Sequence, residues 1–85
     1  MLFRAKLGLA LFRAQAAENQ LAITKREIEI LGMMAEGMGN RAIAKSLGIS
    51  THTVKFHIAA ILDKLGARSR AEAVAIGMRR GLLMM

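Results

Sequence analysis

Apolar residues recur with helical spacing in the second half of the chain. Between residues 51 and 65 they fall at i, i+4, i+7, i+8 and i+11, which places them on one side of a helix. The residues in this apolar stripe are Val54, Ile58, Ile61, Leu62 and Leu65. The pattern predicts a helix over about 51–65 whose apolar side is buried in a core.

A shorter helix and a tight turn are predicted just before this helix. Ile43, Ala44 and Leu47 share one helical face, and Gly48 follows where a helix ends on a residue that tolerates positive φ. Ser50 is an N-cap candidate, because its hydroxyl can accept a hydrogen bond from an amide two or three residues later. Two such helices form a helix-turn-helix, whose second helix enters a DNA major groove. An ordinary helical hairpin in a small bundle is the alternative.

The side of residues 51–65 opposite the apolar stripe is not explained by a core. It carries His52, Phe56, Ala59, Ala60 and Asp63, with Thr53 and Lys55 on its flanks. In a helix-turn-helix, Phe56 can make an apolar contact with a thymine methyl group. The alternative is that its ring packs against the preceding helix or the N-terminal segment.

Another helix is predicted to begin at Thr24. Thr24 and Glu27 have the spacing of a capping box, and Gly37 is expected to end the helix. Its buried face is expected to consist of Ile28, Leu31, Ala35 and Met38.

A last helix is predicted after Gly66 and the sequence ARSR. Ser69 and Glu72 have the spacing of a second capping box, and Gly81 is expected to end the helix before an apolar tail that folds back. One face is expected to pack against helix 51–65 or against a second copy of the chain. That face consists of Ala73, Val74, Gly77 and Met78.

The first 19 residues have the pattern of a basic amphipathic helix with a heptad-like seam. A secretory signal is disfavoured because the apolar run before Arg13 is only six residues long. A transmembrane helix is also disfavoured, because no uninterrupted apolar run in the sequence approaches the ~20 residues that such a helix needs. The seam is expected to be ordered and buried, against a partner chain rather than its own domain, unless the segment is a linker helix from a longer protein. It consists of Phe3, Leu7, Ala10, Ala14, Ala17 and Leu21.

Composition narrows the classes of function. The 85 residues make one domain, and 13 Lys and Arg against 6 Asp and Glu leave a net charge of +7, which favours a polyanion, either nucleic acid or an anionic membrane surface. The absence of Cys excludes disulfides and thiolate chemistry, and the absence of Pro suits a short-looped all-α fold.

His52 and His57 lie five positions apart in the sequence without a third ligand, so no metal site is predicted. No nucleophile and base pair is evident, and we predict neither an enzyme nor a cofactor.

The segment from Ile23 to Leu83 resembles the LuxR-type (GerE or FixJ type) DNA-binding domain, most closely the output domains of NarL-class response regulators. The resemblance rests on ITKREIEIL, AEGMGNRAIAKSLGIS, HTVKFH, DKLGARSRAEAV and RRGLL in this order. It implies a four-helix fold in which the third helix is the recognition helix and the fourth is often used for dimerisation. The family usually has Pro at Lys25, Ser or Thr at Gly39, Glu at Ala42 and Asn at Ala60.

We therefore predict an N-terminal amphipathic or linker helix over residues 1–22 and a LuxR-type domain over 23–85. The domain is expected to act in the cytoplasm as a sequence-specific transcriptional regulator that binds double-stranded DNA as a homodimer, with RNA polymerase as a further candidate partner. A sigma-factor region-four-like module and a basic amphipathic module for a membrane or a partner are the alternatives. The candidate DNA-binding residues are Asn40, Arg41, Ser50, His52, Thr53, Lys55, Phe56, His57, Ala59, Lys64 and Arg68.

Overall fold

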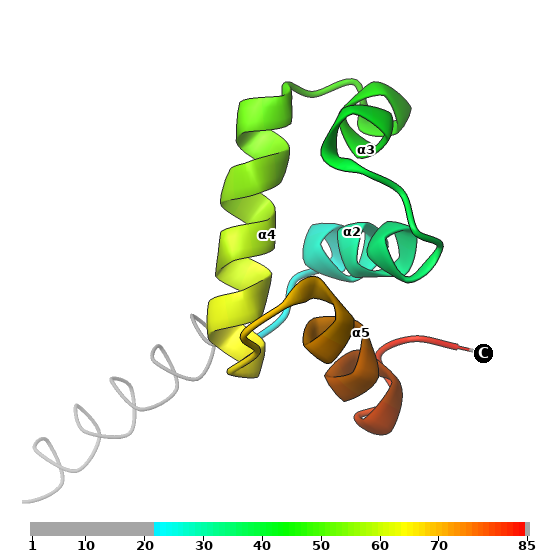
Figure 1. The fold of residues 1–85 in the computed structure, drawn as a ribbon, viewed down its shortest axis with the longest axis vertical. Coiled ribbons are helices and arrows are strands. Elements are labelled where there is room, and N and C mark those ends of the chain that lie inside the picture. The colour runs from blue at the N-terminus through cyan, green and yellow to red at the C-terminus, as the bar shows by residue number, and fades with distance from the viewer. Residues whose placement is uncertain (1–21, 85) are drawn as a thin grey trace, which may run out of the picture.

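The computed structural model describes residues 22–84, and the part of the chain it describes contains helices and no strands. The helices are α2 (Lys25–Ala35), α3 (Asn40–Leu47), α4 (Thr51–Leu65) and α5 (Arg70–Arg79). Helix α4 is the longest, and α3 packs near its start, α2 across its middle and α5 near its end (Figure 1). The predicted N-terminal helix with its seam lies outside the described residues.

Local hydrogen bonds start and end the helices where the sequence predicts. The Thr24 hydroxyl accepts from the Glu27 amide at 3.1 Å, and the Glu27 carboxylate accepts from the Thr24 amide at 2.8 Å, so the first capping box is complete. Gly48 ends α3 with φ of 68°, and the Ser50 hydroxyl caps α4 by accepting from the Thr53 amide at 3.1 Å. The predicted turn of the helix-turn-helix is thereby confirmed.

The second capping box forms only in part. The Ser69 hydroxyl accepts from the Glu72 amide at 3.1 Å, and the structure has no reciprocal bond from the Ser69 amide to the Glu72 carboxylate. One of the two expected bonds therefore starts α5.

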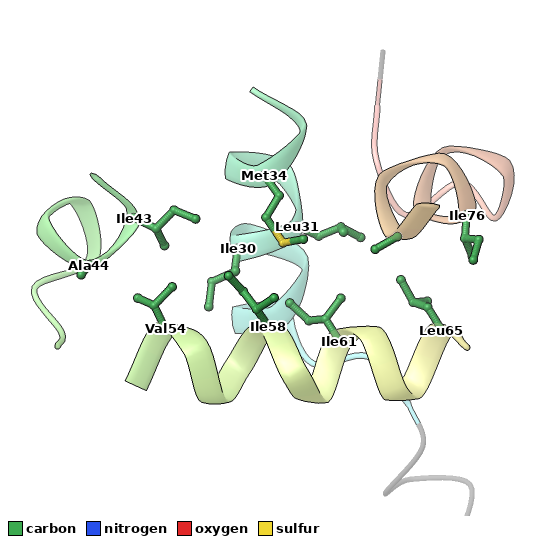
Figure 2. Packing of buried hydrophobic residues seen from close by; sticks show 11 residues of the cluster. Ile30, Leu31, Met34, Ile43, Ala44, Val54, Ile58, Ile61, Leu65 and Ile76 are labelled. Atoms are coloured by element: carbon green, nitrogen blue, oxygen red, sulfur yellow. The ribbon is translucent and has the colours of Figure 1, made fainter. Parts of the chain in front are cut away.

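The core lies between the inner side of α4 and the other three helices. Val54 and Ile61 are fully buried, and their side chains point from α4 into the core, Val54 toward α3 and Ile61 toward α2 (Figure 2). The predicted stripe of α4 is confirmed, with Leu62 only partly buried at its edge. The buried apolar residues are Ile30, Leu31, Met34, Ile43, Ala44, Val54, Ile58, Ile61, Leu65, Ala73 and Ile76.

The predicted buried face of α2 was wrong in its rotation about the helix axis. Leu31 is buried as expected, but Ala35 is exposed, and Ile28 and Met38 are half-buried. The buried positions are i, i+3, i+4 and i+7 from Glu27, because Glu27 itself turns inward toward α4 and thereby sets which side of α2 meets the core. They are Glu27, Ile30, Leu31 and Met34.

Helix α5 directs its small residues into its own domain. Ala73 is fully buried and Gly77 is buried, so neither is available to a second copy of the chain. A Cβ atom at Gly77 would lie 2.8 Å from Leu31 Cδ2, which shows how closely α5 approaches α2. The predicted folding back of the tail is confirmed only in part, because Leu82 and Leu83 are partly buried against the core whereas Met84 is exposed.

Two glycine-to-alanine substitutions separate helix propensity from packing. A Cβ atom at Gly32, inside α2, would lie 3.9 Å from Leu83 Cδ2, an ordinary contact, whereas the one at Gly77 meets the fully buried Leu31. Alanine is about 1 kcal/mol better than glycine inside a helix, and overpacking a core costs about 1–3 kcal/mol. We expect Gly32→Ala to raise the free energy of unfolding by up to about 1 kcal/mol. We expect Gly77→Ala to lower it by about 1 kcal/mol.

Urea unfolding of the two variants beside the parent chain measures both effects. Each variant serves as the control for the other, because both make the same chemical change inside a helix. Equal stabilisation by both would mean that Leu31 moves aside without cost.

Candidate nucleic-acid interface

The two sides of α4 have opposite environments. Val54 and Ile58 are buried, whereas Lys55, Phe56 and Ala59 are exposed, and so is His52. Phe56 keeps 72% of its residue surface exposed, so it does not pack against α3. We call His52, Lys55, Phe56 and Ala59 the outward face of α4; all four were predicted to bind DNA, and the structure brings them together on one side of one helix.

The turn before α4 places two hydroxyl groups beside this face. The hydroxyls of Ser50 and Thr53 lie 2.9 Å apart, and the Ser50 oxygen also accepts from the Thr53 amide. Ser50 is exposed and Thr53 half-buried, so both reach the surface at the amino end of α4. That end of a helix has unpaired amides and a partial positive charge, which favour a phosphate oxygen.

His57 borders the outward face without belonging to it. Its side chain is half-buried, and its ring meets the ring of Phe56 edge-on, with 6.4 Å between centroids and 75° between planes. His57 therefore supports one side of the Phe56 ring. Within residues 22–84, no three His, Cys, Asp or Glu residues gather in a way that could hold a metal ion.

Asn40, predicted to bind DNA, uses its side chain inside the domain. Its Oδ1 accepts a hydrogen bond from the Arg70 guanidinium, which also donates to the Met38 carbonyl oxygen at 3.3 Å. Arg70 at the start of α5 thus holds the start of α3, 30 residues away in the chain. Arg41, the next residue of α3, is exposed. Nothing in the local sequence around Asn40 indicates this contact, because its partner is distant.

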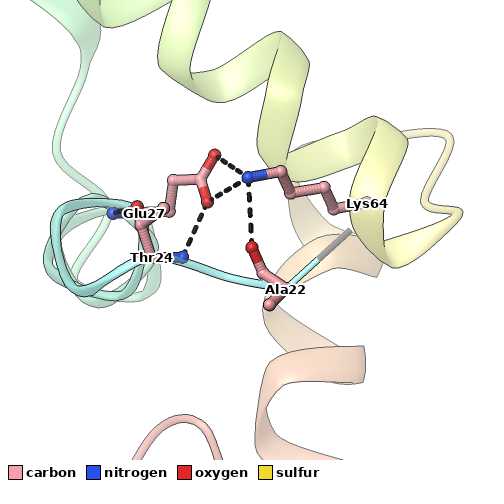
Figure 3. A network of polar contacts seen from close by, with 4 residues as sticks. All are labelled: Ala22, Thr24, Glu27 and Lys64. Atoms are coloured by element: carbon pink, nitrogen blue, oxygen red, sulfur yellow. Dashed lines mark hydrogen bonds and ion pairs between the residues drawn. The ribbon is translucent and has the colours of Figure 1, made fainter. Parts of the chain in front are cut away.

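Lys64, also predicted to bind DNA, forms an ion pair within the domain. Its ammonium lies 2.8 Å and 3.0 Å from the two carboxylate oxygens of Glu27 and 3.2 Å from the Ala22 carbonyl oxygen (Figure 3). Only 17% of the Lys64 side chain and 5% of the Glu27 side chain are exposed. Lys64 therefore joins the end of α4 to the start of α2 and stands apart from the outward face. Arg68, in the link from α4 to α5, is exposed.

The charge state of Glu27 reflects this network. Burial raises the pKa of the Glu27 carboxyl, but hydrogen bonds from the Lys64 ammonium and from Thr24 outweigh burial and hold the pKa below its ordinary value of 4.5. Glu27 is therefore ionised at neutral pH, as the capping box and the ion pair both require.

The arrangement of α3, α4 and their turn defines a helix-turn-helix protein. Residues 21–76, more than half of the chain, match the family model described as bacterial regulatory proteins, luxR family. The chain belongs to this family, and its helix-turn-helix is the DNA-binding output domain that response regulators of the family carry.

Relatives with known roles agree with this assignment. The chain is 42% identical over 71 residues to the transcriptional regulatory protein YdfI of Bacillus subtilis (strain 168), which covers 84% of this chain and 33% of that protein. It is 43% identical over 61 residues to the oxygen regulatory protein NreC of Staphylococcus aureus (strain JH9), covering 72% of this chain and 28% of NreC.

A solved structure extends the similarity to three dimensions. The response regulator ChrA, from a heme-sensing two-component system, matches with a TM-score of 0.71 and 40% identity over 73% of this chain and 31% of ChrA. The chain thus spans about a third of the length of the proteins it matches. None of the helices in residues 22–84 has the length and apolar character needed to span a membrane.

Replacing the Glu27 carboxylate tests the network through its pH dependence. Glu27→Gln retains an acceptor for the Thr24 amide but removes the charge opposite Lys64, so we expect it to lower the free energy of unfolding at neutral pH by about 1–3 kcal/mol. Because the folded pKa is depressed, this contribution is fully present above pH 4.5, the ordinary value, and is lost as the pH falls through the lowered pKa. The difference between parent and variant should therefore close in acid.

Urea unfolding of both chains at several pH values measures this difference. Glu29→Gln is the matched control, because its carboxylate lies 3.6 Å from Arg26 on the surface, with 45% of the Arg26 side chain and 57% of the Glu29 side chain exposed. An exposed pair of this kind contributes about 0–1 kcal/mol. A pH-independent difference for Glu27→Gln would contradict the ion-pair explanation.

Proposed function

We propose that this chain binds double-stranded DNA at specific sequences, as a homodimer with α4 in the major groove, and thereby regulates transcription. The observation that carries the proposal is the outward face of α4, which is exposed along its whole length while the opposite side of the same helix forms the core. Because the opposite side of α4 already packs in the core, the outward face can enter a groove about 12 Å wide without rearrangement of the domain.

Electrostatics supports a nucleic-acid partner. Lys55 stands on the outward face, and Arg41 at the start of α3 is exposed on the helix that precedes the turn. The hydroxyl groups of Ser50 and Thr53 complete a set of groups around the amino end of α4 that can bind phosphate oxygens. Lys64 and the Asn40 side chain do not belong to the proposed interface, because both have partners inside the domain.

The rest of the proposal follows from the family. A transcription regulator acts where the chromosome is, so we place the chain in the cytoplasm, with RNA polymerase as a further partner and with no catalytic activity of its own. A sigma-factor-like module would instead need the polymerase in order to bind DNA, and a membrane module would bind anionic vesicles without binding duplexes.

Selection of bound duplexes from a random pool, by the purified chain alone, tests the proposed function. We expect a recurring sequence whose two halves are related by two-fold symmetry and lie about one helical turn apart. Recovery of a pool with no recurring sequence would overturn the proposal of specific binding, and binding only to anionic vesicles would favour the membrane alternative.

Lys55 is expected to bind a phosphate. The slope of log affinity against log salt is roughly −0.9 for each phosphate neutralised by the protein, so Lys55→Ala should flatten the slope by about one unit and weaken all duplexes alike. Fluorescence anisotropy titrations at several salt concentrations measure the slope. Arg79→Ala, with the same change of charge at the exposed far end of α5, is the control and should leave the slope unchanged. An unchanged slope for Lys55→Ala would place Lys55 outside the interface.

The dimer contact is proposed to lie on the outer side of α5. With Ala73 and Gly77 buried in the domain, the apolar residues still exposed or half-buried on α5 stand at i, i+3, i+4 and i+7. This stripe is continuous along the helix, and Met78 keeps 40% of its surface exposed. The outer stripe of α5 consists of Ala71, Val74, Ala75 and Met78.

A charge in the outer stripe of α5 should separate the two protomers. We expect Ala75→Glu to convert a dimer into a monomer by sedimentation equilibrium, because it would bury two unpaired carboxylates at a two-fold contact. Ala42→Glu, at an exposed position of α3, is the control with the same chemical change.

A truncated variant that lacks residues 1–20 tests whether the N-terminal seam forms the dimer contact instead. Loss of the dimer on this deletion, with Ala75→Glu still dimeric, would assign the contact to the seam.

A further inference from the structure

Phe56 is the exposed aromatic residue of the described domain. The other large apolar side chains that are exposed in residues 22–84 are Met78, on the outer stripe of α5, and Met84 in the tail, so Phe56 is the one that stands on the proposed DNA-binding side. A phenylalanine with 72% of its surface in water has no stabilising role in the core, and the packing of the domain does not account for it.

The neighbours of Phe56 along α4 are also apolar. Ala59 at i+3 is exposed and Ala60 at i+4 is half-buried, so neither residue that follows Phe56 on its own side of the helix carries a hydrogen-bonding side chain; Asp63, about two turns after Phe56, is the next one there. We call Phe56, Ala59 and Ala60 the apolar strip of α4. The His57 ring, nearly perpendicular to the Phe56 ring, lies beside it on one side.

This strip matches one feature of the major groove. Thymine presents a methyl group there, whereas the other bases present only donors and acceptors at their edges. A donor or acceptor pressed against the phenyl ring would lose its bond to water without replacement, which is unfavourable. The small side chains of Ala59 and Ala60 allow the helix backbone to approach the base edges closely.

From these observations we infer that the apolar strip of α4 recognises thymine methyl groups, with Phe56 as the residue that determines specificity. The inference rests on the proposed function and adds the chemical group that is recognised. A protein partner fits the strip less well, because one phenyl ring supplies only about 150–250 Å², whereas a stable protein interface buries about 800 Å² on each partner. Lys55 beside the strip and the net charge of +7 also favour a polyanion.

Deoxyuridine in place of thymidine tests the inference at the level of a single methyl group. The substitution removes the methyl group and keeps every hydrogen-bonding group of the base. In the selected duplex, each thymidine is replaced in turn, and affinity is measured by fluorescence anisotropy. We expect one or two positions per half-site at which the parent chain binds about fourfold more weakly after the replacement, as one buried methyl group implies.

Protein variants test whether the apolar strip of α4 causes the loss of affinity for the deoxyuridine duplexes. Phe56→Ala should bind the thymidine and deoxyuridine duplexes equally, with a nearly unchanged melting temperature, and Phe56→Leu should restore part of the difference. Lys55→Ala is the matched control on the same face and should keep the full fourfold difference while binding both duplexes more weakly.

Several outcomes would overturn the inference. One is the absence of any deoxyuridine effect in a duplex that the parent chain binds specifically, and another is an effect that Phe56→Ala leaves unchanged. If Phe56→Ala lowered the melting temperature strongly and left the methyl sensitivity unaltered, Phe56 would be assigned to packing. If Phe56→Ala changed the oligomeric state in solution, Phe56 would be assigned to self-association. Failure of the parent chain to select any duplex would instead overturn the proposed function itself.

Discussion

Burial of one side of α4 determines which side of the helix remains in water. Val54, Ile58, Ile61 and Leu65 pack against α2, α3 and α5, so a single helix forms the centre of the core and, on its other side, the candidate interface. The two roles are coupled, because a rotation of α4 that moved Lys55 or Phe56 would also take the stripe out of the core. Burial of such a side chain contributes about 1.5–3 kcal/mol, which is enough for the stripe to hold the helix in one orientation.

Two polar contacts join helices that are distant in the chain. The ion pair between Lys64 and Glu27 joins α4 to α2, and the hydrogen bonds of Arg70 join α5 to the start of α3. Both contacts use a basic side chain that composition alone would count among those available to a polyanion. The positive charge open to DNA is therefore smaller than the sequence suggests.

Helix α5 shows how one short helix divides its residues between two tasks. Gly77 allows α5 to approach α2 closely, and Ala73 is buried in the same domain, so the small residues that the sequence suggested for contact with a second copy are not available to it. The side that remains, the outer stripe of α5, is still apolar. Close packing inside the domain and an apolar surface outside it are thus compatible, because the helical repeat separates the two sets of positions.

Features that depend on neighbours within a few positions could be predicted from the sequence. The caps at Thr24 and Ser50, the turn at Gly48 and the stripe of α4 all follow from local hydrogen bonds and helical periodicity. Together with the family motifs, they were sufficient to predict the helix-turn-helix and the outward face of α4. The buried side of α2 and the ion pair of Lys64 with Glu27, in contrast, became known only from the folded structure. That ion pair joins residues 37 apart in the chain, and a contact at that separation depends on how the helices pack rather than on any local pattern.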